Sequence, residues 1–209
     1  MKILIACEFS GIVREAFKAR GHDAWSCDLQ KSLIYGKHYE GDVFDIINNG
    51  FDLMIAFPPC TFLTVTGNKW FKPEFKDRFP DRYMQRVDGI KFFIRLAEAN
   101  IEKIAIENPV GIMSTVYRKP DQIIQPYYFG DEARKGTCLW LKNLPKLIHT
   151  KNDTLFEIKT HVDQGEIVKY KSGKTHAKWY ADALKSKDSA NIRSKTFQGI
   201  ADAMAEQWG

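Results

Sequence analysis

The sequence predicts an α/β fold whose sheet is mostly parallel and flanked by helices. Three short apolar runs with β-branched residues, at residues 2–7, 23–27 and 52–57, have the length and composition of buried strands. A helical pattern separates the first two runs, and such alternation is typical of parallel strands joined by helices. With 209 residues, 44% of them apolar, the chain has the size and composition of one domain, residues 1–209.

The elements follow one another in a regular order along the first half of the chain. After the first strand, a Ser-Gly pair leads into a helical pattern over residues 12–20, which Gly21 ends. The second strand finishes in Asp28. A longer helical pattern over residues 82–100 then precedes another apolar strand at residues 103–106.

Two of the predicted strands end in polar motifs that contain proline. The strand at residues 52–57 runs into a Pro-Pro-Cys motif that ends at Cys60, and the strand at residues 103–106 runs into a Glu-Asn-Pro motif that begins at Glu107. Ligands bind just beyond the carboxyl ends of the strands in open parallel sheets. We therefore expect a functional site where these two motifs lie.

The second half of the chain is more polar. Residues 137–141 are a further strand candidate, and residues 198–208 carry apolar side chains at helical spacing, which predicts a final helix docked on the sheet. Between them, residues 151–193 are lysine-rich and weakly periodic, so we expect a loop-rich insertion there.

Positive charge gathers in one third of the chain. Residues 134–195 carry 14 basic and 6 acidic side chains, whereas residues 1–133 carry 17 and 18, and the whole chain has a net charge of +5. A basic segment of this kind favours a polyanion such as nucleic acid, because each neutralised phosphate releases counterions. A solvated lysine-rich surface is the alternative, with equal weight.

The composition does not support a membrane protein, a disulfide scaffold or a metal site. No run approaches the roughly 18 apolar residues of a membrane span, and the first residues lack the pattern of a leader, so we expect a cytoplasmic protein. The cysteines are widely spaced without a CxxC pair, which favours neither disulfides nor bound zinc. They are Cys7, Cys27, Cys60 and Cys138.

Cys60 and Glu107 have the chemistry of a nucleophile and an acid. The two prolines before Cys60 fix the backbone and would hold its thiol rigidly above the sheet, whereas an arbitrary cysteine more often packs as a small apolar residue. Partial burial would keep Glu107 protonated and able to act as a general acid. Capping of the next segment or pairing with a surface lysine is the alternative role for Glu107.

In this order and on these strands, the two motifs resemble the Pro-Cys and Glu-Asn motifs of the DNA cytosine-5 methyltransferases. The resemblance implies a Rossmann-like methyltransferase fold, S-adenosylmethionine as cofactor and DNA as partner, and the short chain is similar to phage and prophage members. It also implies that the Cys60 thiolate adds to C6 of cytosine while Glu107 protonates N3, so that C5 takes the methyl group. The target base would leave the duplex to reach the site.

The same resemblance indicates the residues that would bind the cofactor. Phe9-Ser10-Gly11 resembles the opening Phe-x-Gly-x-Gly motif, Asp28 falls where an acidic residue holds the ribose hydroxyls, and Asp42 falls where an aspartate meets the adenine amino group. The complete expected set is Phe9, Ser10, Gly11, Asp28, Asp42 and Pro58. Val13-Arg14 stands where a second glycine is expected, so this loop must be tighter or differently shaped.

Residues 129–135 loosely resemble the family segment that touches the target cytosine, and Arg134 is carried over from it as a catalytic residue. An ungapped alignment places Lys135 and Thr137 at the two arginine positions of that segment. The final helix resembles the closing motif that packs beside the first one, and a helix that only covers the sheet is the alternative.

Residues 150–196 form a basic polar insertion in place of a full target-recognition domain. Its aromatic and basic side chains suit exposed nucleic acid, and a small local cluster is the alternative. The expected nucleic-acid contacts are Lys174, His176, Lys178 and Trp179. The aromatic residues between 61 and 86 belong either to a loop that closes on substrate or to ordinary packing.

Together these observations predict transfer of a methyl group from S-adenosylmethionine to C5 of cytosine in DNA through a covalent cysteine adduct. Two alternatives stay open: a catalytically weak relative that binds nucleic acid, and a methyltransferase that acts on RNA or on free cytosine nucleotides. The missing recognition domain favours the first alternative, and the small size fits the second. The basic segment favours a polymer as substrate.

Overall fold

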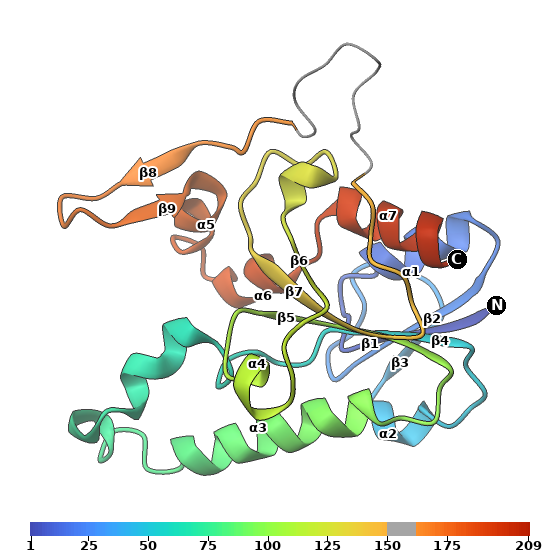
Figure 1. Cartoon of the computed structure of the whole chain (residues 1–209), viewed down its shortest axis with the longest axis horizontal. Helices are drawn as coiled ribbons and strands as arrows, with labels where there is room; N and C mark the ends of the chain where they lie inside the picture. Colours follow the sequence, from blue (N-terminus) through green and yellow to red (C-terminus); the bar gives the residue numbers. More distant parts are fainter. Residues whose placement is uncertain (150–161) are drawn as a thin grey trace.

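The computed structural model describes residues 1–149 and 162–209, and its centre is a seven-stranded sheet with the order β3-β2-β1-β4-β5-β7-β6 (Figure 1). Neighbouring strands are parallel except for β7, which runs antiparallel to both β5 and β6. The strands are β1 (Lys2–Ala6), β2 (Asp23–Asp28), β3 (His38–Glu40), β4 (Leu53–Ala56), β5 (Lys103–Pro109), β6 (Gln122–Ile124) and β7 (Thr137–Lys142).

The central strands are buried on both faces, which explains their continuous apolar sequences. β1 and β4 pair from Ile3 opposite Leu53 to Ala6 opposite Ala56, and all residues of this pairing are fully buried. A parallel strand covered on both sides has no solvent-facing side, so polar residues do not alternate along it. The apolar runs that predicted these strands are therefore a direct consequence of their central position.

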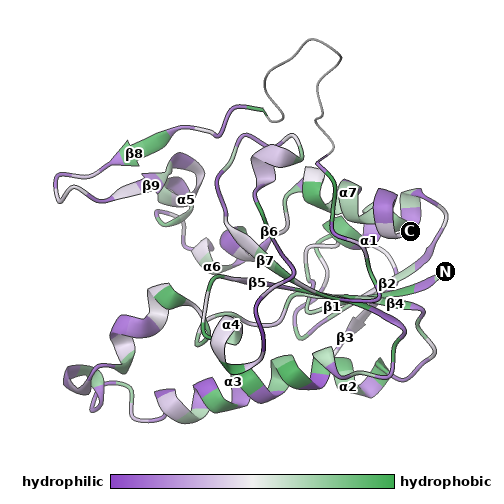
Figure 2. Cartoon of the chain, viewed as in Figure 1, coloured by the Kyte–Doolittle hydropathy of each residue, from purple (hydrophilic) through white to green (hydrophobic). Residues whose placement is uncertain are grey.

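Helices cover both faces of the sheet (Figure 1). Those on one face are α1 (Ile12–Ala19) and α7 (Gln198–Trp208). Those on the other face are α2 (Val43–Ile46), α3 (Arg82–Ala97) and α4 (Met113–Val116). Figure 2 shows hydrophobic and hydrophilic residues alternating along α3, as expected for a helix with one face on the core.

This arrangement confirms the predicted α/β fold with a mostly parallel sheet flanked by helices. The strand order reverses between β1 and β4, because β2 and β3 extend the sheet on one side and β5 extends it on the other. Such a switch point leaves a crevice beyond the carboxyl ends of the two strands, where α/β sheets bind ligands.

The basic segment is more ordered than its sequence predicts. Residues 162–195, named the basic unit from here on, form a hairpin and two helices, so the expectation of a loop-rich insertion is wrong for this part. Gly173 turns the hairpin in the left-handed conformation, and Ala181 and Ala183 are buried. The elements are β8 (Ile167–Lys169), β9 (Thr175–Ala177), α5 (Lys178–Ala183) and α6 (Ser189–Ser194). Residues 150–161, the first part of the predicted insertion, lie outside the described residues.

Several elements were not predicted, because a helix or strand of three or four residues is too short to show a period and a 3-10 turn does not follow the 3.6-residue period. They are β3, β6, α2 and α4 and the 3-10 turns η1 (Val65–Phe71), η2 (Pro73–Phe75) and η3 (Pro126–Tyr128). In the described part of the chain, no helix has both the length and the apolar character that crossing a membrane requires. Within the same residues, no group of three or more His, Cys, Asp or Glu side chains is placed to hold a metal ion.

Candidate active site at the carboxyl ends of the parallel strands

Cys60 lies in a tight turn directly after β4. The Cys60 carbonyl accepts hydrogen bonds from the backbone N–H groups of Leu63 (3.0 Å) and Thr64 (3.2 Å), and Leu63 is fully buried. The Cys60 side chain itself is half-buried. Since prolines offer no N–H for a strand ladder, the two prolines before Cys60 end β4 and present the thiol beyond the edge of the sheet.

Asn108 joins the two predicted motifs. β4 and β5 run side by side and parallel, with Ala56 opposite Ile106, so both motifs lie at the carboxyl end of this pair of strands. The Glu-Asn-Pro motif continues β5 as far as Pro109, where β5 pairs with β7. Asn108 is 1% exposed, and its side-chain Nδ2 donates a 2.8 Å hydrogen bond to the carbonyl of Pro58. This bond ties the segment that carries Cys60 to the segment that carries Glu107.

Backbone contacts extend this tie beyond the two motifs. The N–H of Ile112 donates to the Leu63 carbonyl (2.8 Å), and the N–H of Val65 donates to the Val110 carbonyl (3.2 Å). Between them Gly111 lies so close that a Cβ atom would come within 2.1 Å of the Leu63 carbonyl oxygen. No other residue fits there without moving the turn that contains Cys60.

The thiol of Cys60 and the carboxyl of Glu107 influence each other electrostatically, as expected for a site that contains both. Burial raises the pKa of the half-buried Glu107, and the charge of Lys135 and the Thr137 hydroxyl act in the opposite direction. Burial and then the charge of Glu107 raise the pKa of Cys60, while Lys135 and Arg193 lower it. The structure therefore brings the two predicted catalytic residues together and adds two cations.

Lys135, rather than its neighbour Arg134, is the cation that acts on this pair. Arg134 is exposed, and its carbonyl accepts a 3.1 Å hydrogen bond from Nε1 of Trp179. The half-buried Lys135 points its Nζ to the carbonyls of Arg193 (3.1 Å) and Lys195 (3.3 Å). The ungapped alignment of residues 129–135 with the family segment already places Lys135 at one of its two arginine positions. Arg193 was missed as a site residue, since only the folding of the basic unit brings it near Cys60.

A cavity of about 180 Å³ lies at the switch point, next to the turn of Cys60. Asp28, the last residue of β2, and Asp42, just before α2, both line it, as the sequence predicts for a nucleoside site. Its lining residues are Cys7, Cys27, Asp28, Leu29, Gly41, Asp42, Val43, Pro59 and Phe92. Pro59 lines this cavity, whereas the predicted Pro58 is buried and its carbonyl is occupied by Asn108.

The two aspartates are held by backbone groups beside the cavity. Asp28 is half-buried and accepts from the N–H of Gln30 (2.9 Å), and burial raises its pKa. Asp42 caps α2 by accepting from the N–H of Phe44 (3.0 Å). Both carboxylates thus keep lone pairs for a ligand, because Asp28 accepts from the backbone of Gln30 and Leu29 and Asp42 from that of Phe44, fewer hydrogen bonds than a carboxylate can take.

Glu8, which sequence reasoning missed, fills the start of α1. Its carboxylate is 4% exposed and accepts from the hydroxyl of Ser10 (3.0 Å) and from the N–H groups of Val13 (2.7 Å) and Arg14 (3.3 Å). Burial raises the pKa of Glu8, while these hydrogen bonds and the charge of Arg14 lower it. The predicted cofactor residue Ser10 is therefore engaged inside the protein, and the helix N-terminus already holds an anion.

The fully buried Arg14 accounts for the glycine of the same loop. Gly11 has φ +77°, and a Cβ atom on it would lie 2.9 Å from Nη2 of Arg14 and 3.0 Å from Cβ of Ile34. The Arg14 guanidinium donates to the Ser26 hydroxyl (2.8 Å) and the Ile34 carbonyl (2.6 Å). The absence of a side chain at Gly11 leaves room for the Arg14 guanidinium, whereas the sequence suggested that it would allow close approach of a ligand. The third predicted residue of this loop, Phe9, is buried.

The predicted nucleic-acid residues divide into exposed lysines and packed rings. Lys174 and Lys178 are exposed, and Lys178 forms an ion pair with Glu166. The His176 ring stacks on Tyr180 with centroids 5.3 Å apart. Trp179 is half-buried, and its indole N–H is bonded to the chain as described above. The rings fit the alternative of a local cluster, and Lys178 has a carboxylate partner, whereas Lys174 is exposed at the hairpin.

The aromatic segment after Cys60 forms packing contacts. The Trp70 ring meets the rings of Phe75 and Phe79 edge-on, at 4.9 and 5.5 Å between centroids. The Arg86 guanidinium lies 3.4 Å from the centroid of Phe71 and also donates to a backbone carbonyl. These contacts correspond to ordinary packing, the second of the two roles considered for residues 61–86.

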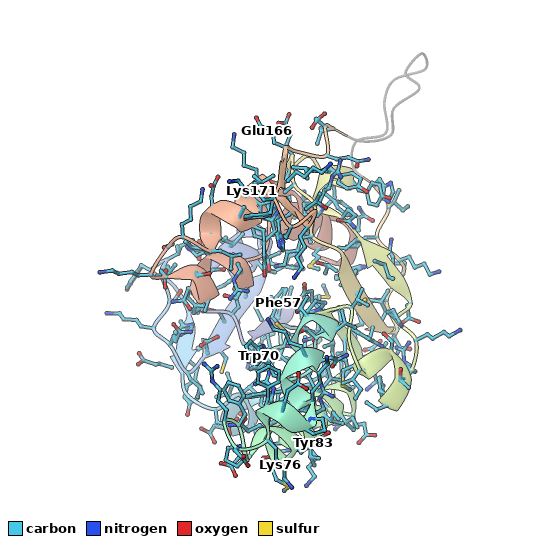
Figure 3. All side chains as sticks on the ribbon, turned by 90° about the vertical axis from the view of Figure 1, so that its left-hand side faces the viewer. Phe57, Trp70, Lys76, Tyr83, Glu166 and Lys171 are labelled. Carbon is cyan, nitrogen blue, oxygen red and sulfur yellow. The ribbon has the colours of Figure 1, made fainter. Side chains whose placement is uncertain are left out.

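Figure 3 looks onto the face where the site opens. Phe57, directly after β4, lies near the centre of this face, with Trp70 and Tyr83 below it and Glu166 and Lys171 of the basic unit above it. The end of β4 therefore lies between the aromatic segment and the basic unit.

Comparisons with known proteins give little beyond this geometry. No protein-family model and no curated protein matches the chain. Among solved structures, the chain is similar to a candidate DNA modification methyltransferase encoded within an E. coli prophage, with 15% identity and a TM-score of 0.43. The match covers 66% of this chain, which spans 45% of the length of that protein. The functional argument therefore rests on the residues of the site.

Replacing Gly111 by alanine should destabilise the protein and disturb Cys60, because the new methyl group would collide with the Leu63 carbonyl. We expect a loss of about 2 kcal/mol or more in the free energy of unfolding, measured with urea. The matched control is Gly89→Ala in α3, where the nearest atom to the new Cβ is a Leu63 side-chain carbon at 3.4 Å. That change should be neutral or stabilise by up to about 1 kcal/mol. Equal stability of the two variants would contradict the tie described here.

Proposed function

We propose that the chain transfers a methyl group from S-adenosylmethionine to C5 of cytosine in DNA through a covalent adduct with Cys60. The observation that carries the proposal is the pairing of Cys60 with Glu107, which Asn108 holds at one edge of the sheet next to a nucleoside-sized cavity. A thiol beside a carboxyl whose pKa is raised, near the switch point of a parallel sheet, provides the nucleophile and the acid of this reaction.

The two residues would act at opposite atoms of one pyrimidine ring. Cytosine C5 is a weak nucleophile, so the Cys60 thiolate adds to C6 while the protonated Glu107 carboxyl donates its proton to N3. The C5–C6 double bond becomes single and a C4–C5 enamine forms, whose C5 can attack the methyl group. After methylation at C5, loss of the C5 proton to a base and elimination of the thiolate restore the ring. Burial favours the neutral carboxyl that this step requires.

The residues around the cavity fit S-adenosylmethionine better than a phosphate-bearing cofactor. Asp28 and Asp42 line it, and none of its described lining residues is a lysine, arginine or histidine. The N-terminus of α1, where Rossmann folds commonly bind phosphate, is filled by the Glu8 carboxylate. A nucleoside that carries a cationic sulfonium suits this acidic environment, and it would supply an electrophilic methyl group.

The cavity suits the nucleoside part of that cofactor. At about 180 Å³ it is smaller than the ~300–1,000 Å³ of typical ligand pockets, so it would enclose only part of the molecule. Asp28 would accept hydrogen bonds from the ribose hydroxyls, and Asp42 would accept from the adenine amino group. Pro59, which lines this cavity, directly precedes Cys60 in the sequence, and this supports a shared site.

DNA is the substrate that the charge distribution supports. The excess of basic residues lies between residues 134 and 195, and the basic unit borders the face onto which β4 ends (Figure 3). A polymer of phosphates would bind along such a surface, and the target base would turn out of the duplex to reach Cys60.

Methyl transfer to DNA should depend on Cys60. We expect wild-type protein to place label from S-adenosylmethionine in 5-methylcytosine, and Cys60→Ser to reduce the rate to below about a thousandth, because the nucleophile is lost. The assay is radiolabel transfer to unmodified DNA followed by analysis of the bases. Cys138→Ala, which removes a buried thiol from the neighbouring β7, serves as control and should retain activity.

A second assay separates catalysis from simple binding. DNA that contains 5-fluorocytosine should form a covalent adduct with Cys60 when S-adenosylmethionine is present, since fluorine at C5 blocks the final elimination. A protein that only binds nucleic acid would form no adduct. Adducts or label on RNA or free cytidine nucleotides, with none on DNA, would move the substrate to those molecules.

The raised pKa of Glu107 also predicts a pH-dependent stability. The folded protein holds the Glu107 proton more tightly than the unfolded chain, so keeping the charged form folded costs free energy once the pH exceeds the unfolded pKa of about 4.3. Glu107→Gln removes this cost. Its free energy of unfolding relative to wild type should therefore increase as the pH rises from about 4 toward 8, as measured by urea titrations. A difference that does not change with pH would show that Glu107 ionises freely.

A further inference from the structure

Both the backbone N–H and the side-chain ammonium group of Lys135 form hydrogen bonds. Its backbone N–H donates to Oε1 of Gln125 (2.9 Å), and its Nζ donates to the carbonyls of Arg193 and Lys195, at the end of α6 and just beyond it. The last carbonyls of a helix carry partial negative charge and favour a cation. The ammonium group therefore has a defined place that α6 provides.

The partners of Lys135 leave its charge available. Both are neutral carbonyls, and no carboxylate in the described part of the chain forms an ion pair with this lysine. Lys135 stands just before β7, whose Thr137 pairs with Pro109 and whose Leu139 pairs with Glu107 of β5, and the Thr137 hydroxyl donates to the Lys135 carbonyl at 3.1 Å. This pairing places Lys135 beside the Glu107 motif, and its charge lowers the pKa of both Cys60 and Glu107. An ammonium that is oriented without being neutralised is suited to act on a neighbouring thiol.

Other contacts fix the basic unit to the same segment of chain. The Trp179 indole N–H binds the Arg134 carbonyl at 3.1 Å. Gly165 approaches the backbone of Glu132 so closely that a Cβ atom would lie 2.3 Å from the Glu132 carbonyl oxygen. In Figure 1, α5 and α6 lie between the β8–β9 hairpin and the sheet. The unit is thus fixed to the residues just before β7 at several points.

We propose that Lys135 is a positioning residue, through which the basic unit holds a positive charge beside Cys60 and Glu107. The proposal rests on the proposed function in one respect, namely that Cys60 reacts as a thiolate. Placement of the basic unit then determines the reactivity of the thiol, so that the segment expected to meet nucleic acid also prepares the nucleophile. The other charged groups that act on Cys60 are Glu107 of β5 and Arg193 of α6, and Glu107 in turn acts on Cys138 of β7.

The test is the rate at which iodoacetamide alkylates Cys60 as a function of pH, with the modified peptide quantified by mass spectrometry. In Lys135→Met the midpoint of this profile should move upward by about one pH unit, since an adjacent positive charge is lost. Lys135→Arg keeps the charge and should restore most of the wild-type profile. Lys91→Met, which removes an exposed lysine of α3, is the control for net charge and should leave the midpoint unchanged.

A second variant tests the part played by the basic unit. Trp179→Phe removes the indole hydrogen bond to Arg134 while keeping the ring, and it should raise the Cys60 midpoint in the same direction by a smaller amount. Trp179→Phe keeps the proposal testable if Lys135→Met fails to fold. Lys135→Gln is a further variant that removes the charge. Thermal unfolding of each variant confirms that the folded protein is compared.

Two outcomes would overturn the proposal. An unchanged midpoint in folded Lys135→Met or Lys135→Gln would show that the charge does not act on Cys60, and an equal shift in Lys135→Arg would show that shape rather than charge matters. The alkylation assay contains neither cofactor nor DNA. Its result therefore stands apart from methyl transfer: a shifted profile without transfer would reject the proposed function and keep the role of Lys135.

Discussion

The hydrogen bond from the Asn108 side chain to the Pro58 carbonyl is the contact on which the candidate site depends. Two successive prolines cannot donate to a sheet, so β4 ends and the buried Pro58 carbonyl needs a donor from elsewhere. A buried carbonyl left without a partner costs roughly 1–3 kcal/mol. Asn108 removes that cost only if β5 continues beside β4 to the edge of the sheet, which places Glu107 near Cys60. The need of the Pro58 carbonyl for a hydrogen-bond donor is thus linked to the placement of Cys60 and Glu107.

Most of the central sheet could be predicted from the sequence, and its margins could not. β1, β4 and β5 are buried on both faces, so burial alone makes their sequences continuous apolar runs. β3 and β6, with three residues each, carry no such signal. The β8–β9 hairpin is polar because much of it faces solvent, and its order comes from a turn and from contacts with residues before β7. Such contacts leave no periodic pattern in the sequence.

The same distinction applies to the site. Cys60 and Glu107 could be predicted, because each follows a recognisable strand and the chemistry of each is visible in its residue type. Glu8, Arg193 and the preference for Lys135 over Arg134 could not, since each depends on side chains that meet only after folding. The Glu8 carboxyl group accepts the N–H groups at the start of α1, in a loop that lacks the expected second glycine. The different loop sequence is thus accompanied by a protein side chain at the position where a ligand was expected.

The proposed reaction needs opposite charge states in two neighbouring groups, and burial favours the neutral form of both. Lys135 favours the thiolate of Cys60, as the reaction needs, but it also favours the carboxylate of Glu107, so it prepares the nucleophile at some cost to the acid. Selective help for the thiol must come from a charge that acts more on Cys60, and Arg193 of α6 lowers its pKa. Since Arg193 and the carbonyls that hold Lys135 all come from the end of the basic unit, the balance between thiol and carboxyl depends on how that unit is seated. The basic unit is thereby part of the electrostatics of the Cys60 thiol.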